Sequence, residues 1–192
     1  MVEKEYKFLV SKSEFDRAIS YAEKAFNMLQ SNIQINYYYD DDRLSLCKED
    51  ITLRVRQINE KLVLQRKDHI VRDNNFAESK EFEKPVWKLP KIIDDKYAFK
   101  GCLITNRCRF LVTGSSSIKL DFDVNFYLGV CDYEIEIEFD ANEVRDNNAV
   151  RNDNKIHEIE ELIKCLGIRD VSPAKGKALR FFDRFKIMMD IL

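Results

Sequence analysis

The sequence has few of the residues that punctuate a chain or build the commonest metal and disulfide sites. Its 192 residues include five glycines, three prolines and two histidines. Two histidines give no good support to a histidine-rich zinc centre or to a Ser-His-Asp triad. The five cysteines are odd in number and are never spaced as Cys-x-x-Cys, which disfavours a disulfide framework and a thiolate zinc site. We therefore expect free thiols in a reducing compartment.

A net charge and a long apolar run are also missing. The 32 lysine and arginine residues nearly balance the 34 aspartate and glutamate residues, so no overall field would attract nucleic acid or an anionic membrane. No segment approaches the ~18 apolar residues needed to cross a bilayer, and the sequence opens on charged residues. These features predict a soluble cytoplasmic protein that binds neither nucleic acid nor membrane, and a homodimer is compatible with them.

The length suits a single domain over residues 1–192, and the periodicity of apolar residues divides it into strands and helices. Strands are expected at residues 1–10, 33–39, 53–59, 61–67, 78–85, 105–114, 117–127 and 129–140. Helices are expected at residues 14–29, capped by Ser11 or Ser13, and at 155–166 and 176–190. A polar turn is expected at 40–43, a short helix within 87–101 and a solvated loop at 142–154. The pattern predicts an α+β domain with about eight strands.

Charged residues occupy alternate positions in strand after strand. Because strand residues i and i+2 point to the same side, Glu3, Glu5 and Lys7 share one face. The same alternation recurs in Arg54-Val55-Arg56, Arg107-Cys108-Arg109, Lys119-Leu120-Asp121-Phe122-Asp123 and Glu134-Ile135-Glu136-Ile137-Glu138. In a single strand this pattern is also that of the solvated face of an antiparallel sheet. Its repetition, with few Ser, Thr or Gln at the charged positions, favours a closed antiparallel barrel with a charged lumen.

A charged lumen calls for a ligand of high charge density. Buried charges are costly unless they pair or bind such a ligand. Paired carboxylates supply hard oxygen ligands for Mg²⁺ or Mn²⁺, whereas Arg and Lys bind phosphate oxygens. A metal bound to polyphosphate needs both kinds of residue. The inventory therefore predicts a small-molecule polyphosphate as the partner and Mg²⁺ or Mn²⁺ as the cofactor.

The charged motifs, taken in chain order, follow the pattern of one known family. They are Glu3-x-Glu5-x-Lys7, Asn36-Tyr37-Tyr38-Tyr39-Asp40, Leu53-Arg54-Val55-Arg56, Asp132-Tyr133-Glu134-Ile135-Glu136, and Ala174-Lys175-Gly176-Lys177 with Arg180. Over essentially the whole chain this series resembles the CYTH, or triphosphate tunnel metalloenzyme, superfamily. The resemblance implies a closed tunnel of eight antiparallel strands with flanking helices. It also implies metal-dependent hydrolysis of a triphosphate, which could be inorganic tripolyphosphate, thiamine triphosphate or a nucleoside triphosphate.

The resemblance and the charge alternation together imply roles for individual residues. Glu3 and Glu5 are expected to hold one metal. Glu134 and Glu136 are expected to hold a second metal or to orient the attacking water, and Glu138 could share the metal role. Lys7 is expected both to take part in catalysis and to bind the triphosphate. The other expected phosphate contacts are Arg54, Arg56, Lys67, Arg107, Arg109, Lys119, Lys175, Lys177 and Arg180.

One position departs from the family pattern. Members commonly have Lys in a Thr-Leu-Lys context in the strand after Arg-x-Arg, whereas this chain has Gln65 there. Lys67 lies two residues later on the same face and is expected to take over that phosphate contact. Glu81 and Glu83 also fit the pattern of the tunnel.

The sequence leaves three other functions open. The same tunnel could belong to an adenylate cyclase that converts ATP to cyclic AMP. It could instead be a non-catalytic polyphosphate- or nucleotide-binding module, although a pure anion site would gain little from paired glutamates. Finally, an ordinary sheet with one solvated face would bind no metal and no triphosphate.

Overall fold

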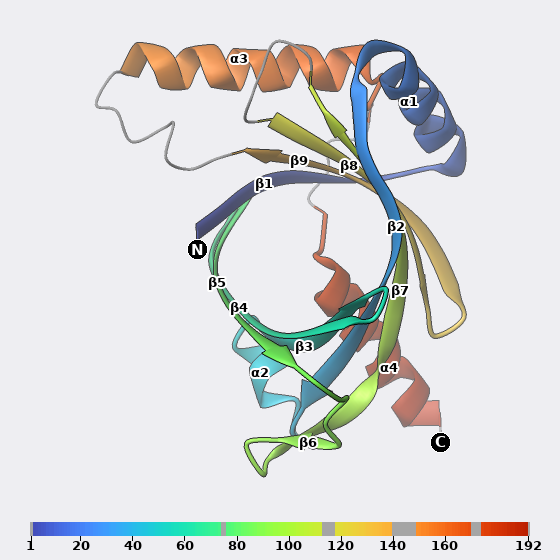
Figure 1. Ribbon diagram of the computed structural model, residues 1–192, viewed down its shortest axis with the longest axis vertical. Helices are drawn as coiled ribbons and strands as arrows, with labels where there is room; N and C mark the ends of the chain where they lie inside the picture. The colour runs from blue at the N-terminus through green and yellow to red at the C-terminus, as the bar shows by residue number, and fades with distance from the viewer. Residues whose placement is uncertain (1, 74–75, 113–117, 140–148, 170–173, 192) are drawn as a thin grey trace.

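The computed structural model describes residues 2–73, 76–112, 118–139, 149–169 and 174–191 (Figure 1). Within these ranges, the side chains at positions 2–3, 72–73, 149–155 and 191 are outside the description. The strands are β1 Val2–Val10, β2 Asn27–Asp40, β3 Ile51–Ile58, β4 Lys61–Asp73, β5 Phe76–Val86, β6 Ile92–Ile93, β7 Tyr97–Leu111, β8 Ile118–Tyr127 and β9 Val130–Phe139. The helices are α1 Lys12–Ala25, α2 Ser45–Lys48, α3 Ala149–Cys165 and α4 Lys177–Ile191.

Eight of these strands form a closed barrel. The order around the sheet is β2-β3-β4-β5-β1-β9-β8-β7, and pairing of β2 with β7 closes the ring. Every pairing in the sheet is antiparallel. The short β6 adds to β7 beside the ring. The predicted eight-stranded antiparallel barrel is therefore confirmed, and Figure 1 shows it as a ring of strands.

The order of the strands decides which of them face each other across the interior. In a ring of eight, strands four places apart lie on opposite walls. β3 therefore faces β9, β4 faces β8, β5 faces β7 and β1 faces β2. The strand with Arg54 and Arg56 thus lies opposite the strand with Glu134, Glu136 and Glu138.

The main apolar core lies outside the barrel, between its wall and two helices. Phe8, Phe122 and Ile135 of the wall belong to one buried cluster with Phe15 of α1 and Leu162 of α3. Figure 1 shows α1 and α3 on the same side of the barrel. Because successive strand residues point to opposite faces, burying the apolar face under these helices turns the charged face inward. The alternation in the sequence thus assigned the two faces correctly.

Helix α4 covers one end of the barrel. The ring of Tyr38 on β2 lies 4.8 Å from that of Phe181 and 5.8 Å from that of Phe182, measured between centroids. Gly101 on β7 allows this approach, because a Cβ atom there would lie 2.7 Å from Cζ of Phe181. In Figure 1 the N-terminal end of α4 is seen within the ring, and residues 176–179 line the interior.

The segment that follows β5 differs from the prediction. The sequence predicts a short helix within 87–101, whereas the structure has β6 and the first residues of β7 there. On β7, the ring of Phe99 lies 6.2 Å from that of Tyr37 and 6.0 Å from that of Tyr39. These contacts join β7 to β2, far away in the sequence. Such pairing leaves no local signal, so periodicity does not reveal this part of the strand.

Two helix boundaries also differ. The sequence predicts a first helix as far as residue 29, but α1 ends at Ala25 because Asn27 already pairs with β7. The predicted loop at 142–154 is wrong from residue 149 onward, where α3 begins, and residues 140–148 lie outside the described part. None of the described helices is long and apolar enough to span a membrane.

The polar turn predicted at 40–43 leads into α2, a helix that the sequence does not predict. The buried carboxylate of Asp40 accepts hydrogen bonds from the backbone N–H groups of Leu46 at 3.1 Å and Cys47 at 2.9 Å. These two N–H groups lie in the first turn of α2, which has no partners for them within the helix. Asp40 therefore stabilises a helix of four residues that would not form alone.

Candidate active site

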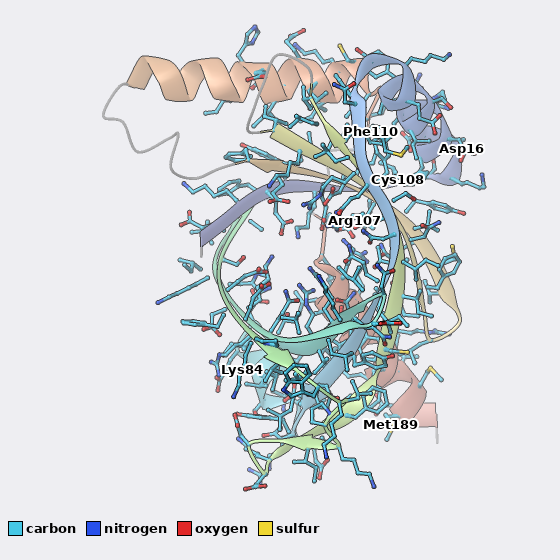
Figure 2. The ribbon with its side chains drawn as sticks, viewed as in Figure 1. Asp16, Lys84, Arg107, Cys108, Phe110 and Met189 are labelled. Carbon is cyan, nitrogen blue, oxygen red and sulfur yellow. The ribbon has the colours of Figure 1, made fainter. Side chains whose placement is uncertain are left out.

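The interior of the barrel is a cavity of about 220 Å³ with a charged lining. Side chains reach it from β1, β2, β3, β4, β5, β7 and β9, together with residues 176–179 at the start of α4. Twelve lining residues are charged, namely Glu5, Lys7, Arg54, Arg56, Lys67, Glu81, Glu83, Arg107, Arg109, Glu136, Glu138 and Lys177. Figure 2 shows side chains projecting into the ring, the labelled Arg107 among them. The structure thus brings together most of the residues that the sequence singles out.

Three carboxylates gather on the wall formed by β8 and β9. Asp123, Glu134 and Glu136 are buried, and one oxygen from each lies within 4.8 Å of the others. Asp123 is directly opposite Glu134 in the strand register. The ammonium of Lys177 lies 2.8 Å from Asp123, 2.7 Å from Glu134 and 2.8 Å from Glu136. Burial by itself lowers the pKa of Lys177, but the three carboxylates outweigh that effect and raise the pKa above its usual value.

Arg107 joins this wall to its neighbour β7. Its Nε and Nη2 donate to both oxygens of Asp123 at 2.7 and 2.5 Å, and Nη2 also donates to Glu136 at 2.5 Å. Its Nη1 lies 2.5 Å from Asp121. Burial lowers the pKa of Arg107, but these carboxylates raise it well above its usual value. Arg107 therefore lines the cavity as predicted, with its charge already shared among carboxylates.

Arg109 repeats this arrangement two residues further along β7. Its Nε and Nη2 donate to the two oxygens of Asp121, both at 2.6 Å, and Nη2 donates to Glu138 at 2.7 Å. The register explains the ladder, because Arg107 is paired with Asp123 and Arg109 with Asp121 across β7 and β8. Alternating charges on neighbouring strands thus form a connected network of ion pairs.

The two arginines of β3 are held differently. Nε of Arg54 donates to the amide oxygen of Gln65 at 2.8 Å, and Nε of Arg56 donates to that of Asn36 at 3.1 Å. Amides fix the direction of a guanidinium without cancelling its charge, and the carboxylate of Glu81 on β5 also attracts both arginines. Gln65, which stands where the family commonly has Lys, also donates to Glu83. β3 therefore presents a basic surface to the acidic wall of β9.

Lys7 and Lys67 surround Glu5 between these two walls. The carboxylate of Glu5 lies 2.7 Å from the ammonium of Lys7 and 3.4 Å from that of Lys67. Lys67 also lies 3.3 Å from Glu81, and Lys7 lies 3.9 Å from Glu136. Burial raises the pKa of Glu5, but the two lysines outweigh it and lower the pKa to about 2. Glu5 is thus ionised at neutral pH, and Lys67 occupies the interior position that the sequence predicts.

Five predicted site residues do not line the cavity or are not described there. The side chain of Glu3 is outside the described part. Glu134 is fully buried behind the lining, next to Lys177. Arg180 is buried too, and its guanidinium donates to Asp132 at 2.9 Å and to Glu134 at 2.9 Å. Its role in the structure is to hold the acidic wall in place.

The remaining two are at the surface. Lys175 lies 2.7 Å from Asp183, and its side chain is 67% exposed. Lys119 lies 3.2 Å from Glu138, and its side chain is 40% exposed. Neither belongs to the cavity lining. Lys175 precedes α4, where the period of two does not apply, and Lys119 is the second residue of β8, so sharing a face with interior residues does not by itself place a side chain in the cavity.

The sequence missed several interior residues. Asp121 and Asp123 are almost completely buried and complete the acidic wall. Their signal was present, because both lie on the same face of β8 as Lys119 in an alternating segment. The neutral residues Gln34, Asn36, Thr52 and Thr105 also line the cavity. Asn36 belongs to one of the family-like motifs, but no role was predicted for it; uncharged polar side chains occur on many solvated strands, so nothing in the sequence distinguished the other three.

The donor set of the acidic wall fits Mg²⁺ or Mn²⁺. Both ions prefer carboxylate oxygens, and Asp123, Glu134 and Glu136 offer one oxygen each around a common point. Burial raises the pKa of Glu136, but Lys177, Arg107 and Lys7 outweigh it and hold the pKa well below its usual value. Metal ligands must be deprotonated. Glu136 meets that requirement at neutral pH.

Comparisons with known proteins find the same barrel. A family model, the CYTH domain, matches residues 1–164. The structure of a Hippeastrum protein described as having a dominant triphosphatase activity has a TM-score of 0.72 at 20% identity, covering 94% of this chain and 95% of that chain. A Bacillus halodurans protein described provisionally as an adenylate cyclase has a TM-score of 0.66 at 22% identity, covering 93% and 96% of the two chains. The triphosphatase of the Mimivirus capping enzyme has a TM-score of 0.55 at 13% identity, covering 85% and 89%.

The structural matches and the family model establish different things. Structural likeness at such low sequence identity shows a shared fold alone. In a separate sequence comparison, no curated protein matches. The family model is more specific, because it spans most of the chain and includes β1, β3 and β9 with their charged motifs. On this evidence the chain belongs to the CYTH domain family.

Proposed function

We propose that this chain hydrolyses a triphosphate inside the barrel with the help of Mg²⁺ or Mn²⁺. The observation that carries the proposal is the opposition of two walls. On one wall, Arg54 and Arg56 are oriented by neutral amides. On the facing wall, Asp123, Glu134 and Glu136 form the acidic cluster. A bound metal–triphosphate would find partners for its phosphate oxygens on the first wall and for its metal on the second.

The basic residues bind and orient the triphosphate in this proposal. Arg54 and Arg56 would donate paired hydrogen bonds to phosphate oxygens, because guanidinium groups match that geometry. Lys7 and Lys67 would add point charges from β1 and β4, where both line the cavity. Phosphoryl transfer depends mainly on alignment and on neutralising the charge of the transferred group. This set of residues supplies both.

The acidic residues hold the metal and the attacking water. Asp123, Glu134 and Glu136 would bind one ion, with Glu5 and Glu138, which are paired across β1 and β9, lining the cavity beside Glu136. When bound, a divalent metal supplies charge neutralisation at the phosphate oxygens and lowers the pKa of water. Carboxylates beside the terminal phosphate would accept hydrogen bonds from that water and point its oxygen at phosphorus. No covalent intermediate on the protein is needed.

The lining favours inorganic tripolyphosphate over an organic triphosphate. Among the described residues that line the cavity, the one aromatic ring is the imidazole of His69, and none is Phe, Tyr or Trp. Adenine and thiazolium rings are commonly bound by stacking on aromatic side chains. Phosphate groups could use the Lys and Arg residues of the lining directly and its carboxylates through a metal, whereas a base would find one ring to stack on, His69, among charged, amide and hydroxyl groups. A cyclase would also need to orient the ribose, and no described feature of the cavity does so specifically.

A metal-by-substrate panel tests this proposal. Tripolyphosphate, thiamine triphosphate and ATP are each incubated with Mg²⁺ and with Mn²⁺, and phosphate, ADP and cyclic AMP are quantified. We expect the highest kcat/KM for tripolyphosphate and no activity when the metal is chelated. Formation of cyclic AMP as the main product from ATP would establish the cyclase instead. Binding of all three without turnover would establish a non-catalytic module.

A further inference from the structure

The ammonium of Lys177 occupies the centre of the acidic cluster. An ammonium has three N–H donors, and three carboxylate oxygens lie 2.7–2.8 Å from Nζ, one each from Asp123, Glu134 and Glu136. These are distances of strong charge-assisted hydrogen bonds. Oxygen ligands of Mg²⁺ lie at about 2.1 Å, so a shift of less than about 1 Å by each oxygen would suit the ion. The point where a metal would sit is therefore the point where Lys177 sits.

The carboxylates around this point are already paired with cations. Lys177, Arg107 and Arg180 contact them, and the ammonium of Lys7 lies 3.9 Å from Glu136. A divalent ion would add two further positive charges to this buried and already paired cluster. Excess charge in a buried site is strongly unfavourable. Binding of a metal is therefore expected to require that one cation leaves.

Lys177 is the cation best placed to leave. Arg107 has a further ion pair with Asp121 at 2.5 Å. Arg180 is tied to Asp132 at 2.9 Å and donates to the backbone oxygen of Lys175 at 2.5 Å. Among the described residues, the ion pairs of Lys177 are with the three cluster carboxylates alone. It stands at the first residue of α4, and its flexible stem lines the open cavity.

We infer that Lys177 is the resident cation of this site and exchanges with the divalent metal. The ammonium leaves the cluster when the metal binds, and it turns toward the cavity, where the triphosphate becomes its new partner. The inference deepens the proposed function and rests on it, because it assumes that the cluster binds a metal. In the absence of triphosphate the metal then binds weakly, because it must displace the Lys177 ammonium while no phosphate is present to pair with that ammonium. Metal and triphosphate strengthen each other's binding, and by linkage the effect is equal in both directions.

The first test measures Mn²⁺ binding without any triphosphate. Free Mn²⁺ is followed by electron paramagnetic resonance during titration of the wild type, Lys177→Met and Lys186→Met. Lys186 is the matched control, because it lies on the same helix at the surface, 3.7 Å from Asp183. We expect Lys177→Met to bind Mn²⁺ at least about tenfold more tightly than the wild type, because its competitor is gone. The control should equal the wild type. Equal or weaker binding by Lys177→Met would overturn the inference.

A second test uses the wild-type chain and so does not depend on the folding of a variant. The ¹⁵N signal of the buried Lys177 ammonium, assigned by its loss in Lys177→Arg, is recorded while Mg²⁺ is added. A large shift or loss of the signal at saturation is expected, whereas an unchanged signal in metal-bound protein would refute the exchange. If no metal binds, an assay of tripolyphosphate hydrolysis shows whether the proposed function or only the exchange of Lys177 is wrong. Metal-dependent turnover would leave the proposed function intact and reject only the exchange, and absence of turnover would reject both.

Discussion

Glu136→Gln is expected to lower kcat/KM for tripolyphosphate by at least about 100-fold. Of the three cluster carboxylates, Glu136 is the one that lines the cavity, and it lies 2.8 Å from Lys177, 2.5 Å from Arg107 and 3.9 Å from Lys7. The amide keeps the shape of the side chain but removes the charge that would bind the metal. The measurement is phosphate release at several concentrations of substrate and metal. High metal concentration should recover part of the activity if metal affinity is what was lost.

The matched control is Glu78→Gln. Glu78 lies on β5 with its side chain 3.7 Å from Lys4, outside the cavity lining. The same substitution there should leave kcat/KM within about twofold, because neither member of this partly exposed pair lines the cavity. A Glu136→Gln protein that is folded and as active as this control would show that the acidic wall has no part in the reaction.

Arg107→Met is expected to lower the free energy of unfolding by about 3–5 kcal/mol. Methionine fills a similar volume, but it removes the bidentate partner of Asp123 and one of the two arginines that contact Asp121, and both carboxylates are almost completely buried. A buried carboxylate that loses its partner keeps its desolvation cost and loses the compensating attraction. Unfolding in urea, followed by circular dichroism, gives the difference directly. Adding Asp123→Asn to the variant should recover part of the loss, since it removes one of the uncompensated charges.

Arg66→Met provides the comparison for this stability measurement. Arg66 lies on β4, is 45% exposed and pairs with Asp68 at 2.9 Å. Exposed ion pairs contribute up to about 1 kcal/mol, so the expected change is small. If Arg107→Met were no less stable than Arg66→Met, the network across β7, β8 and β9 would have to be interpreted as solvated and weak.

The alternation of charged and apolar residues along each strand was sufficient to predict which face of the strand lines the interior of the barrel. Each alternating segment became a barrel strand, and the charged face of each turned inward because its apolar face is buried. That face lies under α1 and α3 for β1, β8 and β9, and in a separate cluster with Leu46 of α2 for β3. A slip of one residue would exchange these faces along a whole strand. The positions of Glu5, Lys7, Arg54 and Glu136 could therefore be predicted without knowing any contact.

What the sequence could not predict depends on contacts between distant segments. Lys175 and Lys177 look equivalent in the sequence. In the structure, Lys175 pairs with Asp183 at the surface, whereas Lys177, the first residue of α4, lies in the acidic cluster. Arg54 is held by an amide, whereas Arg107 is held by carboxylates. This difference depends on which strands are paired in the barrel. These pairings decide which cations remain available for phosphate, and they follow from barrel closure.

The measurement that tests the central claim most directly is metal-dependent phosphate release from tripolyphosphate by the wild type, Arg56→Ala and Arg66→Ala. Arg56 lies in the cavity opposite the acidic wall, and Arg66 is an exposed arginine next along the sheet on β4. The account predicts equal turnover for the wild type and Arg66→Ala, and a loss of about 10- to 100-fold in kcat/KM for Arg56→Ala. Equal turnover by all three proteins, or turnover that persists after chelation of the metal, would contradict it.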